Sequence, residues 1–275
     1  MNKPKITIIT ASYNSRDYIE GALKSIAIQT YKNIEHLVID AASTDDTIEI
    51  VKKYSTTKWM SESDQGIYDA LNKGFTQADG DIFSWLDSDN YYASSSVLER
   101  VANTFIEKPA TQVVITNSYL LYPEHNNEKE LIDNGIPTYE KLLNKGNQFI
   151  PESVFFKREL FEKVGGFNLS YRLLADYDLW IRIFKLNPKV VKLSVVSAIY
   201  IVRNDALLRN DPFNAWLESF MIGKCHGRSK GSRLRNRIRY IWERIKFPLM
   251  KFLRTRPRLH AFYTYNFRKF FKPLY

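Results

Sequence analysis

Residues 80–90, GDIFSWLDSDN, place a short apolar run directly before two carboxylates that are separated by one residue. The run has the length and composition of a buried strand, and Asp87 and Asp89 leave it at a turn. Residues 5–15, KITIITASYNS, repeat this arrangement near the start of the chain, where a β-branched run is followed by the polar residues 12–15. We therefore expect two buried strands whose carboxyl ends both carry polar side chains.

Helix and strand patterns alternate between these two segments. The expected elements are a helix over 19–26, a buried strand over 34–39, a helix through 48–51, a short strand near 59–60, a helix from about 66 to 78 and a strand over 82–86. Because parallel strands are joined by crossover helices, the alternation predicts a Rossmann-like α/β unit over the first hundred residues. Ligands of such sheets bind at the carboxyl ends of the strands, where Asp40, Asp87 and Asp89 lie.

The second hundred residues are less regular. The expected elements are strands at 113–115, 154–156 and 190–202 and helices over 159–164 and 177–186. The polar segment 121–134, which is rich in Glu and Asn, predicts a mobile loop. We divide the chain into a domain over residues 1–205 and a basic, mainly helical C-terminal region over residues 206–275.

The composition excludes several classes of protein. Of the 275 residues, 44% are hydrophobic and 25% are charged, which is typical of a folded globular chain and not of a collagen or a disordered tail. The one cysteine, Cys225, excludes an internal disulfide framework and a thiolate metal cluster, and it favours a reducing compartment. Neither a signal-peptide pattern nor an apolar run of the ~18 residues that cross a membrane is found, so we expect a soluble or peripheral cytoplasmic protein.

The charge is concentrated at the C-terminus. Residues 224–275 hold 16 Lys and Arg against one acid, Glu243, while residues 1–223 carry a net charge of −5. Apolar residues from Leu234 to Leu249 follow helical spacing with arginines beside them, which is typical of a helix lying at an anionic membrane surface. The alternative is a helix that packs this stripe on the body. Nucleic-acid binding is not expected, because no recognition-helix or ribonucleoprotein-type motif accompanies the charge.

Several motifs together resemble a known family. The segments ITIITASYNS, VIDAASTDDT, SESDQGIYDALNKGF, GDIFSWLDSDN, and VFFKRELFEKVGGFN followed by ADYDLWIRI are similar, in order and spacing, to the inverting family 2 glycosyltransferases of the GT-A fold, particularly bacterial enzymes that assemble surface polysaccharides. The resemblance spans residues 5–202. It implies a mixed α/β GT-A fold and transfer of a sugar from a nucleoside diphosphate sugar, expected to be UDP-linked, to a hydroxyl of a glycan or lipid-linked glycan.

The resemblance also implies donor contacts. Asp40 matches the position that accepts a hydrogen bond from the nucleotide base, and a carboxylate suits the N3–H of uracil because it offers acceptors only. Tyr13 would then stack on the base, Ser12 would bond to the ribose, and Asp64 would contact base or ribose. Lys73 is a candidate for the diphosphate. The alternatives are a helix cap for Asp40, a half-buried strand-end aromatic for Tyr13 and a solvated surface lysine for Lys73.

The metal and the base follow from two further matches. Asp87 and Asp89 match the motif that holds Mn²⁺ or Mg²⁺, with Asp89 the direct ligand and Asp87 shared between metal and ribose. Asp176 matches the general base that removes the acceptor's proton, and Asp178 is its rival. Asp176 and Asp178 could instead be acids that stabilise the N-terminus of a helix through its dipole.

The sequence departs from the motifs of the family at three places, so not every role of the family's residues can be assigned to this chain. Asn90 replaces a third acid, Ala175 replaces a glutamate, and Pro151-Glu152 stands where many relatives have His-Gln or Gln-Glu in the acceptor-facing region. Acceptor identity is therefore the least transferable expectation. A catalytically inactive nucleotide-sugar-binding or scaffold protein is the competing class, and a missing base or metal pair would indicate it. We expect an enzyme that is peripheral at the inner face of the cell membrane.

Overall fold

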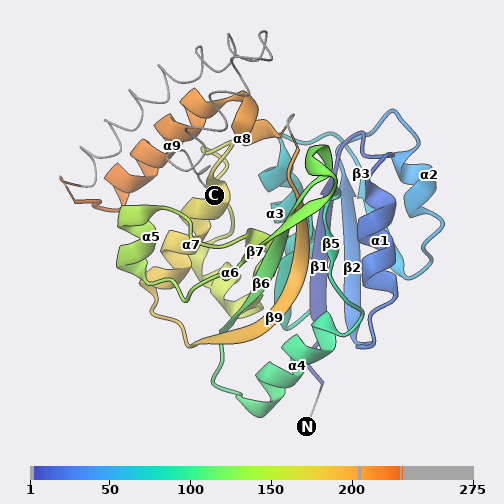
Figure 1. The fold of residues 1–275 in the computed structure, drawn as a ribbon, viewed down its shortest axis with the longest axis horizontal. Coiled ribbons are helices and arrows are strands. Elements are labelled where there is room, and N and C mark those ends of the chain that lie inside the picture. Colours follow the sequence, from blue (N-terminus) through green and yellow to red (C-terminus); the bar gives the residue numbers. More distant parts are fainter. Residues whose placement is uncertain (1–2, 204–205, 230, 232–275) are drawn as a thin grey trace.

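The computed structural model of the protein describes residues 3–203, 206–229 and 231 (Figure 1). The expected amphipathic stripe over 234–249 and the aromatic residues after it lie outside these described residues. Within the described part of the chain, no helix is long and apolar enough to cross a membrane.

The first third of the chain forms the parallel side of a sheet. Its elements are β1 (Ile6–Ser12), α1 (Ile19–Ala27), β2 (Ile34–Asp40), α2 (Thr47–Val51), β3 (Thr57–Ser61), α3 (Ile67–Gln77) and β4 (Ile82–Trp85). The strands pair in the order β3-β2-β1-β4, all parallel, as the alternation predicts. The register sets Ser12 beside Asp40 and Asp40 beside Ser61, so the last residues of three strands lie side by side at one edge.

The rest of the described chain extends the sheet with antiparallel pairs and one parallel pair, β6 with β9. Its elements are β5 (Tyr91–Tyr92), α4 (Val97–Glu107), β6 (Val113–Tyr122), η1 (Pro123–His125), β7 (Glu128–Ile132), α5 (Tyr139–Lys145), η2 (Pro151–Ser153), β8 (Val154–Lys157), α6 (Arg158–Val164), α7 (Ala175–Lys185), β9 (Val190–Ile201), α8 (Leu207–Asn210) and α9 (Pro212–Cys225). From β4 the order continues β8-β6-β9-β5, with β8 antiparallel to β4 and to β6. The sheet is therefore mixed, as expected.

The prediction of a mobile loop over 121–134 is wrong. Strand β6 runs to Tyr122, and β7 pairs with it antiparallel from Ser118–Ile132 to Tyr122–Glu128. Asn126 and Asn127 make the turn, with φ angles of 52° and 59°, a region that asparagine tolerates better than most residues. The strand is hard to see in the sequence because β7 lies at the surface, so no apolar run marks it.

The sheet buries side chains on both faces. Along β1 the side chains alternate, with Ile9 in a cluster shared with α3, α6 and α7 and Ile8 in a cluster shared with α1 and α4. Helix α3 packs directly on the strands at Gly74, where a Cβ atom would lie 2.7 Å from Ile9 Cγ2 and 3.0 Å from Ile39 Cγ1. Only glycine permits this close approach, which packs α3 against the strands whose carboxyl ends carry the polar residues.

Candidate active site

Asp40 lies between Ser12 and Ser61 at the carboxyl ends of β1, β2 and β3 and is hydrogen-bonded to both. Its buried carboxylate accepts hydrogen bonds from Ser12 Oγ (2.9 Å), Ser61 Oγ (2.7 Å) and the backbone N–H (2.9 Å) and hydroxyl (2.5 Å) of Ser43. These four donors match the four acceptor positions of a carboxylate. The role of Asp40 and Ser12 in binding the nucleotide stays a prediction, and a base contact would require one serine hydroxyl to turn away.

Tyr13 follows Ser12 and leaves 64% of its surface exposed. The turn that presents it is held by Asn14, which has a φ of 46° and whose side-chain oxygen accepts a hydrogen bond from the backbone N–H of Thr44 at 2.9 Å. Ser15 Oγ lies 3.0 Å from Ser88 Oγ and so joins this turn to the one that carries Asp87 and Asp89. An exposed ring on an ordered turn is suited to stacking on a base.

The other two predicted donor residues lie at α3. Asp64 Oδ1 accepts a hydrogen bond from the backbone N–H of Gly66 at 2.8 Å, where the chain turns into the helix. Lys73 Nζ lies 2.8 Å from Glu62 Oε1 and 3.4 Å from Asp69 Oδ2. The hydrogen bond to Glu62, with the nearby acids, raises the pKa of Lys73. Lys73 would have to exchange these partners to reach a diphosphate, so its role stays a prediction.

Asp87 and Asp89 leave β4 at a tight turn closed by the Asn90 N–H to the carbonyl of Asp87 at 3.0 Å. Burial, followed by the charge of Asp89, raises the pKa of Asp87 to about 7. Asp87 Oδ1 is buried and finds no hydrogen-bond partner among the described residues. On the other side of the turn, Arg203 Nη1 lies 3.4 Å from Asp89 Oδ2. Both side chains are half-buried, and the pair therefore combines a carboxyl of raised pKa, Asp87, with one that lies near an arginine, Asp89.

These oxygens fit a divalent cation. Among residues 3–203, 206–229 and 231, no three His, Cys, Asp or Glu side chains are grouped so as to hold a metal ion by themselves. Mg²⁺ and Mn²⁺, however, commonly take one or two carboxylates and complete their shell with phosphate oxygens and water. A cation between Asp87 and Asp89 would give the orphaned Oδ1 a partner and relieve the repulsion between the two carboxyls.

Glu152 joins this acidic group from η2. Asn90 Nδ2 donates to Glu152 Oε1 at 2.5 Å, and the backbone N–H of Ile201 donates to Asn90 Oδ1 at 2.8 Å. Burial, and then the charge of Asp87, raises the pKa of Glu152 well above its ordinary value. Asn90, at the place of the third acid, thus connects the turn both to Glu152 and to β9.

Asp176 lies at the second position of α7, near enough to Asp87 for its charge to act on that carboxyl. The Tyr68 hydroxyl of α3 lies 2.9 Å from Asp176 Oδ1 and 3.0 Å from the carbonyl oxygen of Leu173, so its single proton can go to either. Burial raises the pKa of Asp176 to about 6, against hydrogen bonds that lower it. The charge of Asp176 also raises the pKa of Asp87.

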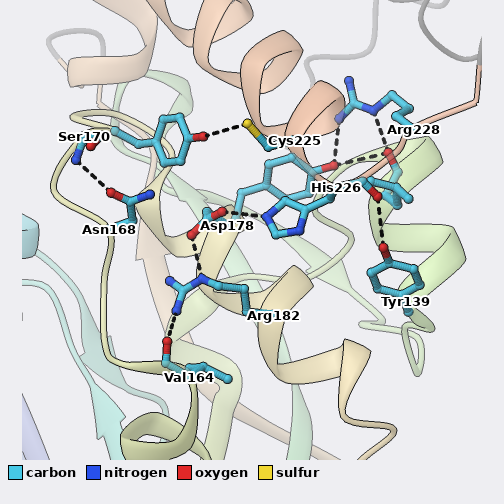
Figure 2. Close-up of polar contacts among 12 residues, drawn as sticks. Tyr139, Val164, Asn168, Ser170, Asp178, Arg182, Cys225, His226 and Arg228 are labelled. Atoms are coloured by element: carbon cyan, nitrogen blue, oxygen red, sulfur yellow. Dashed lines mark hydrogen bonds and ion pairs between the residues drawn. The ribbon is translucent and has the colours of Figure 1, made fainter.

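Asp178 occupies a different environment (Figure 2). Its side chain is 4% exposed, with Arg182 Nε at 2.7 Å from Oδ2 and His226 Nε2 at 2.8 Å from Oδ1. Burial alone would raise its pKa, but His226 and Arg182 outweigh burial and hold the pKa of Asp178 below its ordinary value. Both oxygens of Asp178 are engaged, whereas Asp176 combines a partly exposed side chain with raised basicity, which favours Asp176 as the base.

The comparisons with known proteins identify the family. The glycosyl transferase family 2 profile matches residues 7–165, so the chain belongs to that family. A PGL/p-HBAD biosynthesis glycosyltransferase of Mycobacterium tuberculosis is 31% identical over 207 residues, which are 73% of this chain and 78% of that protein. An uncharacterized glycosyltransferase of Rickettsia prowazekii is 30% identical over 196 residues, covering 67% of this chain and 60% of the relative.

Solved structures with the same architecture confirm the GT-A fold. TarS of S. aureus superposes with a TM-score of 0.64 at 21% identity, over 79% of this chain and 39% of that one. The chain therefore spans well under half of the longer TarS protein. Residues 1–349 of TarS in complex with UDP-GlcNAc give a TM-score of 0.63 at 20% identity, over 81% of this chain and 66% of that one. Mannosyltransferase PcManGT from Pyrobaculum calidifontis, in complex with GDP-Man and Mn²⁺, superposes with a TM-score of 0.59 at 23% identity. The match covers 80% of this chain and 64% of that one.

The structure brings Asp87, Asp89 and Asp176 together at one end of the sheet and adds residues that the motifs did not indicate. Tyr68 lies in the first turn of α3, within the segment SESDQGIYDALNKGF that carries part of the family resemblance. Glu152 stood out only as a departure from the expected motif. Arg203, which also stacks over the Tyr18 ring at 4.1 Å, carries no sequence signal that distinguishes it from any other arginine.

Proposed function

We propose that the chain transfers a sugar from a UDP-linked donor to an acceptor hydroxyl with inversion of configuration. The observation that carries this proposal is the environment of Asp176, a half-buried carboxylate 2.9 Å from the Tyr68 hydroxyl, whose pKa burial raises to about 6. A base with this pKa is ionised at pH 7 and remains more basic than an ordinary aspartate. Family membership sets the class of reaction.

In the proposed step Asp176 takes the proton of the acceptor hydroxyl. The hydroxyl oxygen forms a bond to the anomeric carbon as the bond from that carbon to the diphosphate breaks on the opposite face, and the electron pair leaves with the diphosphate. Asp87 and Asp89 would hold Mg²⁺ or Mn²⁺, which neutralises the negative charge that develops on the leaving group. Tyr68 donates to Asp176 and so orients the base before transfer.

The donor is proposed from three lines of support. Structures of TarS contain UDP or UDP-GlcNAc, the fold is shared, and the exposed Tyr13 lies next to the serine and aspartate row at the sheet edge. We propose that the nucleotide base stacks on Tyr13 and bonds to Asp40. The ribose would lie near Ser12, Asp64 and Asp87, and the diphosphate beside Lys73. The structure of PcManGT is a complex with GDP-Man, which makes a GDP-linked donor the alternative.

The acceptor is proposed to be a glycan or lipid-linked glycan of a bacterial cell surface. The mycobacterial relatives are named for PGL/p-HBAD biosynthesis, and residues 224–275 carry a formal charge of +15. About 1 kcal/mol for each basic residue near an anionic surface would give reversible binding at the inner face of the membrane. Removal of residues 232–275 should abolish co-sedimentation with anionic vesicles and leave donor hydrolysis intact; if vesicle binding survives, the membrane role of this region is wrong.

A panel of nucleotides and nucleotide sugars with and without Mn²⁺, read by thermal shift, tests the donor and the metal. A donor at ~100 times its dissociation constant stabilises by ~2.7 kcal/mol. UDP-sugars should stabilise the protein with Mn²⁺, and Asp89→Ala or a chelator should remove the metal-dependent part and donor turnover. Turnover of Asp89→Ala at the wild-type rate in chelator would contradict the metal role. Binding without any turnover would instead favour a nucleotide-sugar-binding scaffold.

A further inference from the structure

Helix α9 supplies a carboxylate to the segment that precedes the catalytic helix. Glu218 Oε1 accepts a hydrogen bond from the backbone N–H of Arg172 at 2.8 Å, and Oε2 accepts from the N–H groups of Leu173 and Leu174, both at 2.9 Å. We call these three hydrogen bonds the Glu218 clamp. Hydrogen bonds to an ionised acceptor are about twice as strong as neutral ones, so one side chain holds three consecutive peptide groups.

The clamped segment leads directly into Asp176. Leu174 is the N-cap of α7 and provides no side-chain cap, because leucine has no acceptor. Asp176 follows two residues later, and the Tyr68 hydroxyl lies within hydrogen-bond distance of both Leu173 O and Asp176 Oδ1. Glu218 therefore holds the peptide group between Leu173 and Leu174 through the Leu174 N–H, and the carbonyl oxygen of the same group shares the Tyr68 proton with Asp176.

The residues after Glu218 fasten α9 to the same helix (Figure 2). His226 Nε2 lies 2.8 Å from Asp178 Oδ1, and the buried Arg228 donates from Nη2 to the Tyr177 hydroxyl at 2.8 Å and from Nε to the Leu143 carbonyl at 2.6 Å. These contacts fix where α9 lies relative to α7. Glu218 of α9 then contacts the backbone N–H groups on the N-terminal side of Asp176.

We infer that Glu218 is a positioning residue for the general base: it holds residues 172–174 so that the carboxylate of Asp176 lies where the acceptor hydroxyl is deprotonated. The inference rests on the proposed role of Asp176. It also makes α9, which lies in the predicted C-terminal region, part of the catalytic unit. Displacement of a reacting group by about 1 Å can cost ~10²-fold in rate, which sets the size of the expected effect.

Glu218→Gln tests the clamp with little change of shape. Glutamine keeps one acceptor oxygen but turns an NH₂ group toward a backbone N–H, so at least one of the three hydrogen bonds is lost. The matched control is Asp211→Ala, which removes the side chain that accepts a hydrogen bond from the Asn214 N–H at 3.2 Å and caps the same helix. Within the described residues Asp211 makes no hydrogen bond to residues 172–174, and only its charge acts on Arg172. The probes are UDP release from UDP-GlcNAc and the other donors of the panel with Mn²⁺, and amide hydrogen exchange, which needs no donor.

Glu218→Gln should lower kcat by about 10- to 100-fold with the donor KM within about twofold, and should speed amide exchange at Leu173 and Leu174. Asp211→Ala should keep kcat within about twofold. In the Asp176→Asn background, Glu218→Gln should change kcat by less than about twofold, because the group that it positions is gone. An unchanged kcat for Glu218→Gln, or the same loss in both backgrounds, overturns the inference alone. Wild-type turnover by Asp176→Asn would instead overturn the base assignment and, with it, the catalytic consequence of the clamp.

Discussion

Replacing Asp176 with asparagine should make the protein more stable and less active. The folded environment raises the pKa of this carboxyl from 3.8 to about 6, so at neutral pH the charged form opposes folding. A difference of about two pH units corresponds to ~3 kcal/mol. Because the side chain is partly exposed, solvent screening reduces this to about 1 to 2 kcal/mol.

The stability difference should depend on pH with a defined sign. Between about pH 4 and pH 6 the folded protein keeps the Asp176 proton that the unfolded chain has released, so wild-type stability falls as pH rises through this window. Asparagine does not titrate, so Asp176→Asn should be the more stable protein at pH 7 to 8, and its advantage should vanish near pH 4. Loss of the Asp176 charge also lowers the pKa of Asp87, which adds to the effect in the same direction.

Urea denaturation of both proteins between pH 4 and pH 8 measures this difference, and donor turnover is measured in parallel. Turnover of the wild type should fall below about pH 6 as the base becomes protonated, and Asp176→Asn should be ~10²- to 10⁴-fold slower at pH 7. If the variant is no more stable than the wild type at pH 7, or if its advantage persists unchanged to pH 4, the environment assigned to Asp176 is wrong.

Three further changes test the neighbouring contacts. Tyr68→Phe removes the hydroxyl that lowers the pKa of Asp176, so the acid limb of the pH–rate profile should move to higher pH; a limb that stays in place would show that the hydroxyl does not act on the base. Asp178→Asn should destabilise by about 1 to 3 kcal/mol in urea while the folded variant keeps its turnover, and a greater loss of kcat than in Asp176→Asn would make Asp178 the base. Gly74→Ala should destabilise by about 1 to 3 kcal/mol, since its Cβ would lie 2.7 Å from Ile9 Cγ2; equal or higher stability in urea would mean that α3 can move off the sheet.

The sequence by itself determines the parallel half of the fold. The β-branched runs that become β1, β2 and β4 and the helices between them are local patterns, and parallel pairing follows because each strand is followed by a crossover helix. The end of each strand is also local, so Asp40 and the pair Asp87 and Asp89 could be assigned to one edge before any contact was known. Family resemblance then indicated Asp176, because its motif lies within a few consecutive residues.

Only the tertiary structure decides how these carboxyls differ from one another. Asp176 and Asp178 are two residues apart, yet one meets Tyr68, 108 residues away in the chain, and the other meets His226, 48 residues away. Glu218 reaches the segment before α7 from 44 to 46 positions along the chain. The pKa of a carboxyl depends on burial and on charges and donors within a few ångströms, and the sequence does not specify which distant residues will supply them.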